Sequence, residues 1–388
     1  MNNPIRKKED FLIYSSPKIE DAEINEIVEI MRSGWLGTGP KVALFENEFK
    51  NYKGAQYAIA LNSCTAALHL SLIAAGIKQG DEVITTPMTF CSTVNAIIHA
   101  GGTPVLADID PITLNIDPFE ISKKITSKTK AILPVHFAGR PCDMEAIMEI
   151  AKKNSLLVIE DCAHAIETKY KGKQVGTIGD FGCFSFYVTK NIVTGEGGMI
   201  LTANENYANR IKRLALHGMD KDAWKRFGDD GYKHYKVVEC GFKYNMMDLQ
   251  AGIGLHQLSR IDSYLKRREE IWNIYMDELT GLPIGLPAEP EENTKHAFHL
   301  FTVQIEKDKC GKSRDEFINE MTANNIGVGV HYQSIPEHPY YHQTYGWSPE
   351  NYPNAYHIGK STVSLPISAK LSDKDIRDVV KTVKLICG

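Results

Sequence analysis

The stretch KAILPVHFAGRPCDMEAIMEIAKKNSLLVIEDC, residues 130–162, decides the fold of this chain. It opens with the apolar run KAILPVHF (130–137) and closes with LLVIEDC (156–162), and between them DMEAIMEIAKKN (143–154) has apolar residues at helical spacing. Near-continuous apolar runs are typical of strands buried on both faces, and parallel strands need a crossover such as a helix. The stretch therefore predicts a strand, a helix and a second, parallel strand.

The same alternation extends from residue 57 to about residue 203. Five more β-rich runs are present: YAIAL (57–61), EVITTP (82–87), TPVLADI (103–109), FGCFSF (181–186) and GMILTA (198–203). Helical segments such as TAALHLSLIAAGI and TFCSTVNAIIHAG separate the earlier runs. The pattern predicts an α/β fold with a largely parallel, seven-stranded, doubly wound sheet between helices.

The remaining sequence predicts a second, smaller unit. Residues 248–279 have apolar positions at helical spacing and a polar start, which indicates one long or broken helix that bridges two domains. A Pro/Gly-rich segment follows, and then three expected strands and two expected helices: HLFTVQIE (299–306), VGVHY (328–332), TVSLPI (362–367), RDEFINEMTANN (314–325) and a last helix from Ser372. We expect a large α/β domain over residues 1–255 and a small α+β domain over residues 256–388.

Composition excludes several classes of protein. Of 388 residues, 43% are hydrophobic and 24% charged, which is ordinary for a globular protein, and a net charge of -4 gives no reason to expect nucleic acid or an anionic membrane as partner. The eight cysteines are scattered without a C-x-x-C pair, and neither a signal peptide nor a long apolar run is present. We expect a cytoplasmic protein with reduced cysteines. No H-E-x-x-H motif or paired carboxylate cluster with usable spacing predicts a metal site.

Polar residues follow the ends of several expected strands, where functional groups gather in open α/β sheets. Ser63 and Thr65 lie at the start of a helix, where free N–H groups favour an anion, although taken alone they fit an ordinary N-cap better. Asp161 ends a buried strand and needs a partner, either a salt bridge or a ligand with a protonated ring nitrogen. Phe90 can lie against a flat ligand, and Lys190 precedes the tight turn GEGG (195–198). Together these groups are typical of a site for pyridoxal 5'-phosphate (PLP).

The motifs SGWLGTGP (33–40), VIEDCAHA (158–165), FSFYVTKNIVTGEGG (184–198) and GFKYNMMDLQAGIG (241–254) resemble those of the DegT/DnrJ-type sugar aminotransferases. The resemblance runs in order from roughly Tyr14 to the C-terminal helix, and it implies the aspartate-aminotransferase architecture, PLP fold type I. Within this family, PVHFAG, GFKYN and GVGVHY look most like the enzymes that aminate a 4-keto sugar on UDP, among them the UDP-4-amino-4-deoxy-arabinose aminotransferases.

The resemblance implies a role for individual residues. Lys190 matches the catalytic lysine that forms a Schiff base with PLP, and Asp161 matches the aspartate on the pyridine nitrogen. His164 matches the residue beside the ring hydroxyl, and Phe90 the aromatic that stacks on the ring. The residues that match phosphate contacts are Cys64, Thr65 and Ser185.

Further residues are implied as contacts to substrate or to the neighbouring protomer. The family forms homodimers with active sites at the protomer interface, so Lys243 and Asn245 are expected to reach the partner's site, where the individual role of each stays open. The residues expected to bind substrate are Trp35, Thr38, Glu196, His331 and Tyr332. A structural role is the alternative for Glu196, as a loop anchor, and for the aromatic residues; His136 and His217 equally fit as structural histidines.

The implied activity is transfer of an amino group from glutamate to a nucleotide-linked 4-keto sugar in the biosynthesis of a cell-surface polysaccharide such as lipopolysaccharide. Amination of a 3-keto sugar or a cyclitol ketone is the alternative. Sugar dehydration is disfavoured because the related dehydratases have histidine at the position of Lys190. A PLP-binding regulator is disfavoured because the chain offers no helix-turn-helix with a basic face.

Overall fold

The computed structural model describes residues 4–220 and 234–388, and its centre is a sheet of seven strands in the order β1-β9-β8-β5-β4-β2-β3. The strands are Tyr57–Leu61 (β1), Glu82–Thr85 (β2), Thr103–Leu106 (β3), Thr129–Leu133 (β4), Leu157–Asp161 (β5), Phe181–Ser185 (β8) and Gly198–Thr202 (β9). Neighbouring strands from β3 to β8 pair in parallel, whereas β9 pairs antiparallel with both β8 and β1. Six of the seven strands fall within an apolar run identified in the sequence, β4 begins one residue before its run, and the predicted largely parallel sheet is confirmed.

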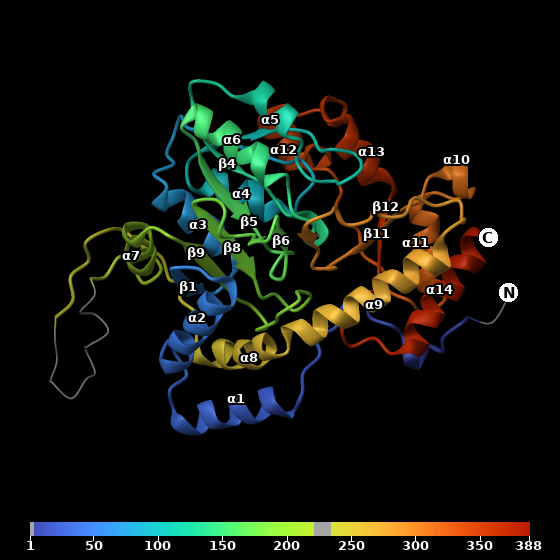
Figure 1. Ribbon diagram of the computed structural model, residues 1–388, viewed down its shortest axis with the longest axis horizontal. Helices are drawn as coiled ribbons and strands as arrows, with labels where there is room; N and C mark the ends of the chain where they lie inside the picture. The colour runs from blue at the N-terminus through green and yellow to red at the C-terminus, as the bar shows by residue number, and fades with distance from the viewer. Residues whose placement is uncertain (1–3, 221–233) are drawn as a thin grey trace.

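Helices cover both faces of this sheet (Figure 1). One face packs against α3 (Cys64–Ala74), α4 (Cys91–His99) and α7 (Glu205–Leu214), and the other against α2 (Pro40–Lys53), α6 (Met144–Asn154) and α8 (Asp248–Ser259). Alternate residues of β1 divide between the two cores, with Ile59 and Leu61 on the first face and Ala58 and Ala60 on the second. This two-sided burial explains why the strands read as continuous apolar runs.

The remaining elements are smaller or lie at the edges of this layered unit. Helices α1 (Asp21–Ser33) and α5 (Pro118–Lys124) belong to the first half of the chain, and β6 (Lys169–Tyr170), β7 (Lys173–Gln174) and β10 (Thr294–Lys295) form a short second sheet. The others are α10 (Lys307–Cys310), α11 (Arg314–Ala323), α12 (Pro339–Tyr345), α13 (Pro353–Ser361), α14 (Asp373–Cys387), β11 (Phe301–Gln304) and β12 (Thr362–Leu365).

Helix α9 (Ile261–Leu279) continues from α8 after a break at Arg260, so the expected helix over 248–279 is a broken one. The apolar side of α9 belongs to a separate core, which it forms with α11, α14, β11 and β12. Figure 1 shows α8 beneath the large sheet and α9 running away from it toward the C-terminal helices. This arrangement supports a bridging role for 248–279, and the domain division at residue 255 stays a proposal.

One expected element does not form. The run VGVHY (328–332) was expected to be a strand, but only Gly329 pairs, in an isolated bridge with Ser364. Glycines at 327 and 329 weaken a strand because they add backbone entropy and no packing side chain. Within the ranges 4–220 and 234–388, no helix combines the length and the apolar character that crossing a membrane requires.

Candidate active site

A cavity of about 690 Å³ lies at the carboxyl ends of the parallel strands β5 and β8 and beside the segment 329–332. Its lining includes most of the site residues predicted from the sequence: Cys64, Thr65, Phe90, Asp161, His164, Ser185, Lys190, Glu196, His331 and Tyr332. These side chains converge because parallel strands end at the same edge of a sheet. The volume is in the range of pockets that hold a cofactor or small ligand.

The N-terminus of α3 forms one wall of the cavity. Ser63 caps the helix with its Oγ, which accepts an N–H hydrogen bond of 3.1 Å from the first turn. The first N–H groups of a helix lack intrahelical acceptors and, with the helix dipole, favour a negative charge. Gly198 passes so close that a Cβ there would lie 2.4 Å from the Ser63 carbonyl, so glycine is required for the approach. With the hydroxyl-bearing Thr65 and Ser185 in the same lining, the wall fits a phosphate group.

Asp161 ends β5 with its carboxyl group buried and its side chain 3% exposed. Its Oδ2 accepts a hydrogen bond from Thr93 Oγ1 at 2.9 Å, and its Oδ1 accepts one from the Ala163 N–H at 3.1 Å. Burial raises the pKa of Asp161 above its usual value, because these bonds and the nearby Lys190 only partly offset the loss of hydration. A buried carboxyl group of this kind is stabilised by a cationic partner, and a protonated ring nitrogen would be one.

Glu160, the residue before Asp161, points to the opposite face of β5, as successive residues of a strand do. Its two oxygens accept N–H groups of the turn 176–179, and His136 Nε2 lies 3.0 Å from Oε2. Although burial by itself raises the pKa of Glu160, His136 and the N–H groups outweigh it and hold that pKa below its usual value. Glu160 and His136 therefore form a structural pair. Cys162 lies within 4.8 Å of both, but the donor atoms of the pair are occupied by these hydrogen bonds.

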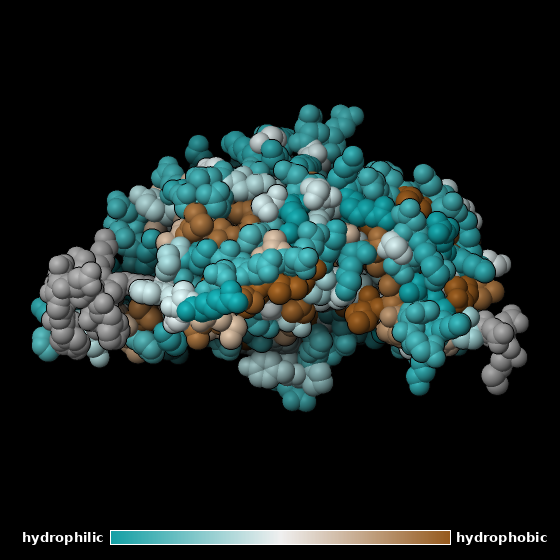
Figure 2. Space-filling view, turned by 90° about the horizontal axis from the view of Figure 1, so that it is seen from below, coloured by the Kyte–Doolittle hydropathy of each residue, from teal (hydrophilic) through white to brown (hydrophobic). Residues whose placement is uncertain are grey.

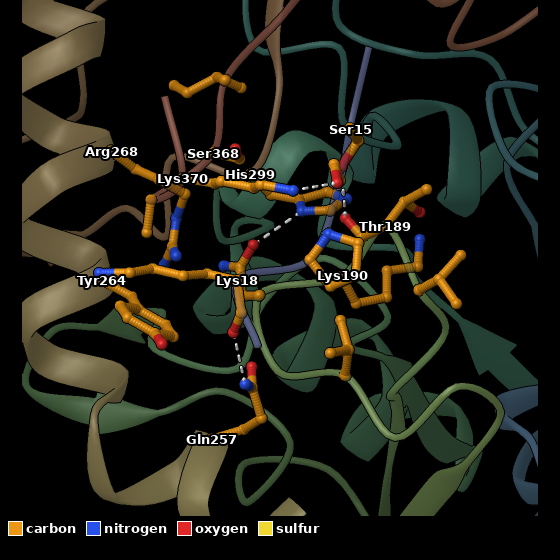
Figure 3. Close-up of a pocket in the computed structure, with 17 residues that line it drawn as sticks. Ser15, Lys18, Thr189, Lys190, Gln257, Tyr264, Arg268, His299, Ser368 and Lys370 are labelled. Carbon is orange, nitrogen blue, oxygen red and sulfur yellow. Dashed lines mark hydrogen bonds between the residues drawn. The ribbon is translucent and has the colours of Figure 1, made fainter. Parts of the chain in front are cut away.

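Lys190 lies in the irregular loop after β8, where its backbone N–H bonds to the Tyr187 carbonyl at 2.9 Å. Burial lowers the pKa of its amine to about 8, and the neighbouring Cys64 and Asp161 oppose that shift only in part. A neutral amine is a nucleophile and a base, so this lysine suits Schiff-base chemistry near neutral pH. The far side of the loop borders a second, small cavity of about 30 Å³, which Figure 3 shows with Lys190, Thr189 and His299 around it.

His164 and Tyr332 form a pair on the wall opposite the sheet. His164 Nδ1 accepts the Ala138 N–H at 3.3 Å, and its Nε2 lies 3.1 Å from Tyr332 Oη. Burial, with Lys190 and two nearby histidines, holds the pKa of His164 well below its usual value, so the ring is neutral and carries its proton on Nε2. That proton is donated to Tyr332, whose own hydroxyl hydrogen is thereby free for a ligand. Phe90, 58% exposed, lies at the cavity edge with its ring centroid 6.2 Å from that of Tyr332.

Four of the predicted site residues lie apart from this cavity within one protomer. Trp35, Thr38 and Asn245 line a separate cavity of about 470 Å³, in which Asn245 Nδ2 donates to Thr38 Oγ1 at 2.6 Å. Lys243 lines a third cavity of about 340 Å³, which also contains His217. None of these four side chains lines the Lys190 cavity of the same protomer.

Several residues of the site were not predicted from the sequence. Tyr14, Thr89, Ser92 and Tyr187 line the cavity, and Thr93 holds Asp161. Thr89 and Thr93 are four residues apart at the start of an expected helix, and that spacing is the one signal that pointed toward them. No comparable signal marks Tyr14, which lies far from the strand ends in the sequence.

Comparisons with known proteins agree with this geometry. The model of the DegT/DnrJ/EryC1/StrS aminotransferase family matches residues 17–384. The chain is 49% identical to the uncharacterized protein MJ1066 of Methanocaldococcus jannaschii and 48% identical to the spore coat polysaccharide biosynthesis protein SpsC of Bacillus subtilis, with 98% of each chain covered in both cases. Its structure is similar to that of the putative sugar aminotransferase Spr1654 of Streptococcus pneumoniae, with a TM-score of 0.90, 34% identity and 97% of both chains covered. Spr1654 has been solved in its PMP and PLP forms.

Proposed function

The chain belongs to the DegT/DnrJ/EryC1/StrS aminotransferase family, and from that premise we propose that it transfers an amino group from glutamate to a nucleotide-linked 4-keto sugar with PLP as cofactor. One observation carries the proposal. A half-buried lysine of lowered pKa and a buried strand-end carboxyl group face the same cavity as a helix N-terminus that fits a phosphate.

The residues present fit PLP at each of its functional groups. The start of α3, with Thr65 and Ser185, would hold the phosphate, and Asp161 would hold the proton of the ring nitrogen. Phe90 would lie against the ring and His164 beside its hydroxyl group. When bound, PLP supplies an aldehyde that reacts with amines and a ring that accepts electrons from the substrate carbon. Asparagine in place of Asp161 would bind the ring without holding that positive charge.

Lys190 would act as both nucleophile and proton carrier. Because the pKa of its amine is lowered to about 8, part of the population is neutral near pH 7 and free to take a proton at Nζ. An arginine at this position would stay charged and do neither. Glutamate and the sugar would occupy the same cavity in turn, and we therefore expect ping-pong kinetics.

The substrate assignment rests on the sequence motifs and on what the relatives are named for. SpsC is named for polysaccharide biosynthesis and Spr1654 as a sugar aminotransferase. His331 and Tyr332 add polar groups to the cavity wall, and polar groups of this kind bind sugar hydroxyls through hydrogen bonds. Burial lowers the pKa of His331 to about 3, so its ring is a neutral hydrogen-bonding group.

A homodimer would bring the separated residues to the site. Helix α1 exposes Ile24, Val28 and Met31, at 54%, 38% and 62%, and their spacing places them on one side of the helix. Figure 2 shows apolar side chains gathered in patches on the face that carries α1. Exposed apolar patches are typical of interaction surfaces. In such a dimer Lys243 and Asn245 would serve the partner's cavity.

The assay that tests the function uses the full chain loaded with PLP, glutamate as donor, and a panel of UDP-, dTDP- and GDP-linked 4-keto sugars. Product would be identified by mass and NMR, with Lys190→Ala as the matched control. We expect amination at C4 of at least one UDP-linked sugar. If only 3-keto sugars or cyclitol ketones react, the position of amination is wrong, and if no ketone reacts, the function is wrong.

A further inference from the structure

The residue after Lys190 is buried on the other side of its loop. Asn191 is 9% exposed, and neither residue belongs to a helix or strand. Lys190 therefore lacks the regular backbone hydrogen bonds that fix catalytic residues on strands. A reacting group has to be held within about 0.5 Å of its working position, so a lysine on a loop depends on side chains that anchor the loop.

Asn191 makes three hydrogen bonds that determine one another's direction. Its Nδ2 donates to Glu167 Oε2 at 2.8 Å and to the Ala297 carbonyl at 3.3 Å, and its Oδ1 lies 2.8 Å from His299 Nδ1. Because an ionised carboxylate only accepts hydrogen bonds, the amide NH₂ has to face Glu167. The amide oxygen then has to accept from His299, which fixes the proton of that ring on Nδ1.

An ion pair holds Glu167 in this position. Arg268 donates from Nη2 to Glu167 Oε1 and from Nε to the Ala297 carbonyl, the latter at 3.2 Å. Both side chains are buried, with Glu167 0% and Arg268 3% exposed. Burying two charges is costly, and removing one partner of such a pair leaves the other uncompensated. Figure 3 shows Arg268, His299 and Lys190 around the small cavity, and Lys190 lines the large cavity as well.

The same network also reaches the opposite wall of the large cavity. The His299 ring lies against that of His164, with centroids 4.4 Å apart, and His164 contacts Tyr332. Burial, together with Lys190, Arg268 and two nearby histidines, holds the pKa of His299 well below its usual value. His299 is therefore a neutral ring with a fixed proton, and it does not add a repelling charge next to Lys190.

We propose that Asn191 is a positioning residue for Lys190, and that the buried Glu167–Arg268 pair acts on the lysine through the Asn191 amide. None of the three is placed to touch the reacting atoms, so their effect is on where the Lys190 amine lies. The inference rests on the proposed function in one respect, which is that Lys190 is the amine that reacts with PLP.

A pair of isosteric substitutions tests this. Asn191→Asp alone would put two carboxylates 2.8 Å apart, where only one can stay ionised. Glu167→Gln alone would replace one of the two carboxylate oxygens with an NH₂ group. That group would face another donor, either Arg268 or the NH₂ of Asn191. The double variant restores the exchanged contacts: the new amide donates to the new carboxylate, Arg268 keeps an acceptor, and His299 Nδ1 still donates. The Ala297 carbonyl loses the Asn191 N–H but keeps the one from Arg268 Nε. Its net charge equals that of the wild type.

The measurement follows the visible absorption band that appears when PLP is added to the cofactor-free full chain. The rate of band formation is measured at increasing PLP concentration. The PLP concentration that gives half of the maximal rate reports initial binding, and the maximal rate, a limiting first-order constant, reports reaction with Lys190. We expect each single substitution to lower the limiting constant by about 10- to 100-fold with little change in half-saturation. The double variant should return to within about threefold of the wild type, since the two sites are coupled.

Asn115→Asp is the matched control for general destabilisation. Asn115 is 4% exposed and likewise holds backbone groups, with its Nδ2 2.9 Å from the Pro141 carbonyl and its Oδ1 2.9 Å from the Phe137 N–H. This variant should have a lower melting temperature than the wild type and the same limiting first-order constant. If Asn191→Asp does not fold, Asn191→Ala serves in its place, because it removes the anchoring amide without adding a charge.

Three outcomes overturn the positioning role. The first is a wild-type limiting constant in a folded Asn191 variant. The second is a double variant no faster than the slower single variant. The third is a limiting constant that falls as much in the Asn115 control as in the Asn191 variant. Failure of the proposed function looks different, because the wild type itself would then form no band, or Lys190→Ala would form the same one.

Discussion

Thr93 donates a hydrogen bond from Oγ1 to Oδ2 of Asp161 at 2.9 Å, and through that bond α4 holds the end of β5. Thr93 Oγ1 also lies 2.7 Å from Thr89 Oγ1. Since an ionised carboxylate only accepts, the order of donation is fixed: Thr89 donates to Thr93, and Thr93 donates to Asp161. This chain of hydroxyl groups stabilises the ionised carboxylate, which is the form that can hold a proton on a ring nitrogen.

Asp161→Asn should bind PLP but turn over slowly. The amide keeps the size of the side chain and loses the charge, so the rate with glutamate should fall about 100- to 1000-fold, the usual effect of removing one electrostatic partner from a reacting group. Single-turnover rates with glutamate measure the loss, and uptake of PLP by the variant is the control. A variant with the wild-type rate would show that Asp161 has no part in the reaction.

The amine of Lys190 should titrate near pH 8 in the cofactor-free chain. Its pKa is lowered by burial, so the neutral, reactive form appears as the pH rises through about 8. An ordinary lysine becomes reactive only near about 10.4. The rate at which an amine-specific reagent labels Lys190, followed by peptide mass spectrometry across pH, gives the midpoint. Exposed lysines in the same digest supply the reference, and a midpoint equal to theirs would contradict the lowered pKa.

Glu160→Gln should destabilise the fold in a pH-dependent way. Because the pKa of Glu160 is lowered in the folded protein, its stabilising effect is present above the usual value of 4.5 and is lost as the pH falls through the folded-state pKa. At neutral pH the substitution should lower the free energy of unfolding by about 1–3 kcal/mol, the range for leaving buried hydrogen-bonding groups without their partner. Urea titrations of both proteins over a range of pH test this. A difference in the free energy of unfolding between the two proteins that stays constant or grows as the pH falls would contradict this prediction.

Mixing two inactive variants should recover activity if Asn245 works across a dimer. Each variant, Lys190→Ala or Asn245→Ala, lacks one group at every site of its own dimer. A mixed dimer would contain one site with both groups. After random exchange of equal amounts, about one quarter of all sites would be intact. The control mixes Lys190→Ala with Asp161→Asn, whose residues line the same cavity of one protomer, and no recovery is expected there. Equal behaviour of the two mixtures would place Asn245 outside the partner's site.

The sequence predicted the features that repeat or that lie at the ends of strands. Apolar runs located all seven strands because each is buried on both faces, and Asp161 and Lys190 stood out because they follow such runs. The segment 328–332 also looks apolar, yet with Gly329 inside it and Gly327 just before it, it makes a single bridge to Ser364 of β12. Trp35 and Thr38 line a separate cavity, and their separation from Lys190 could not be predicted because it depends on how distant segments pack.

The network behind Lys190 could not be predicted either. Asn191 contacts Glu167 and His299, which are 24 and 108 residues away in the sequence. Single polar residues at such separations leave no periodic signal, and each reads as an ordinary surface residue until the fold buries it. Only the packed structure shows that an ion pair, an amide and an imidazole meet at the loop of the reactive lysine.

The central claim is that Lys190 and Asp161 face one PLP molecule, and reduction of the loaded full chain with borohydride tests it most directly. Peptide mass spectrometry should then find one pyridoxyl group per chain, attached to Lys190, and the Lys190→Ala variant should carry none. An adduct on another lysine, or a protein that takes up no PLP, would contradict the account.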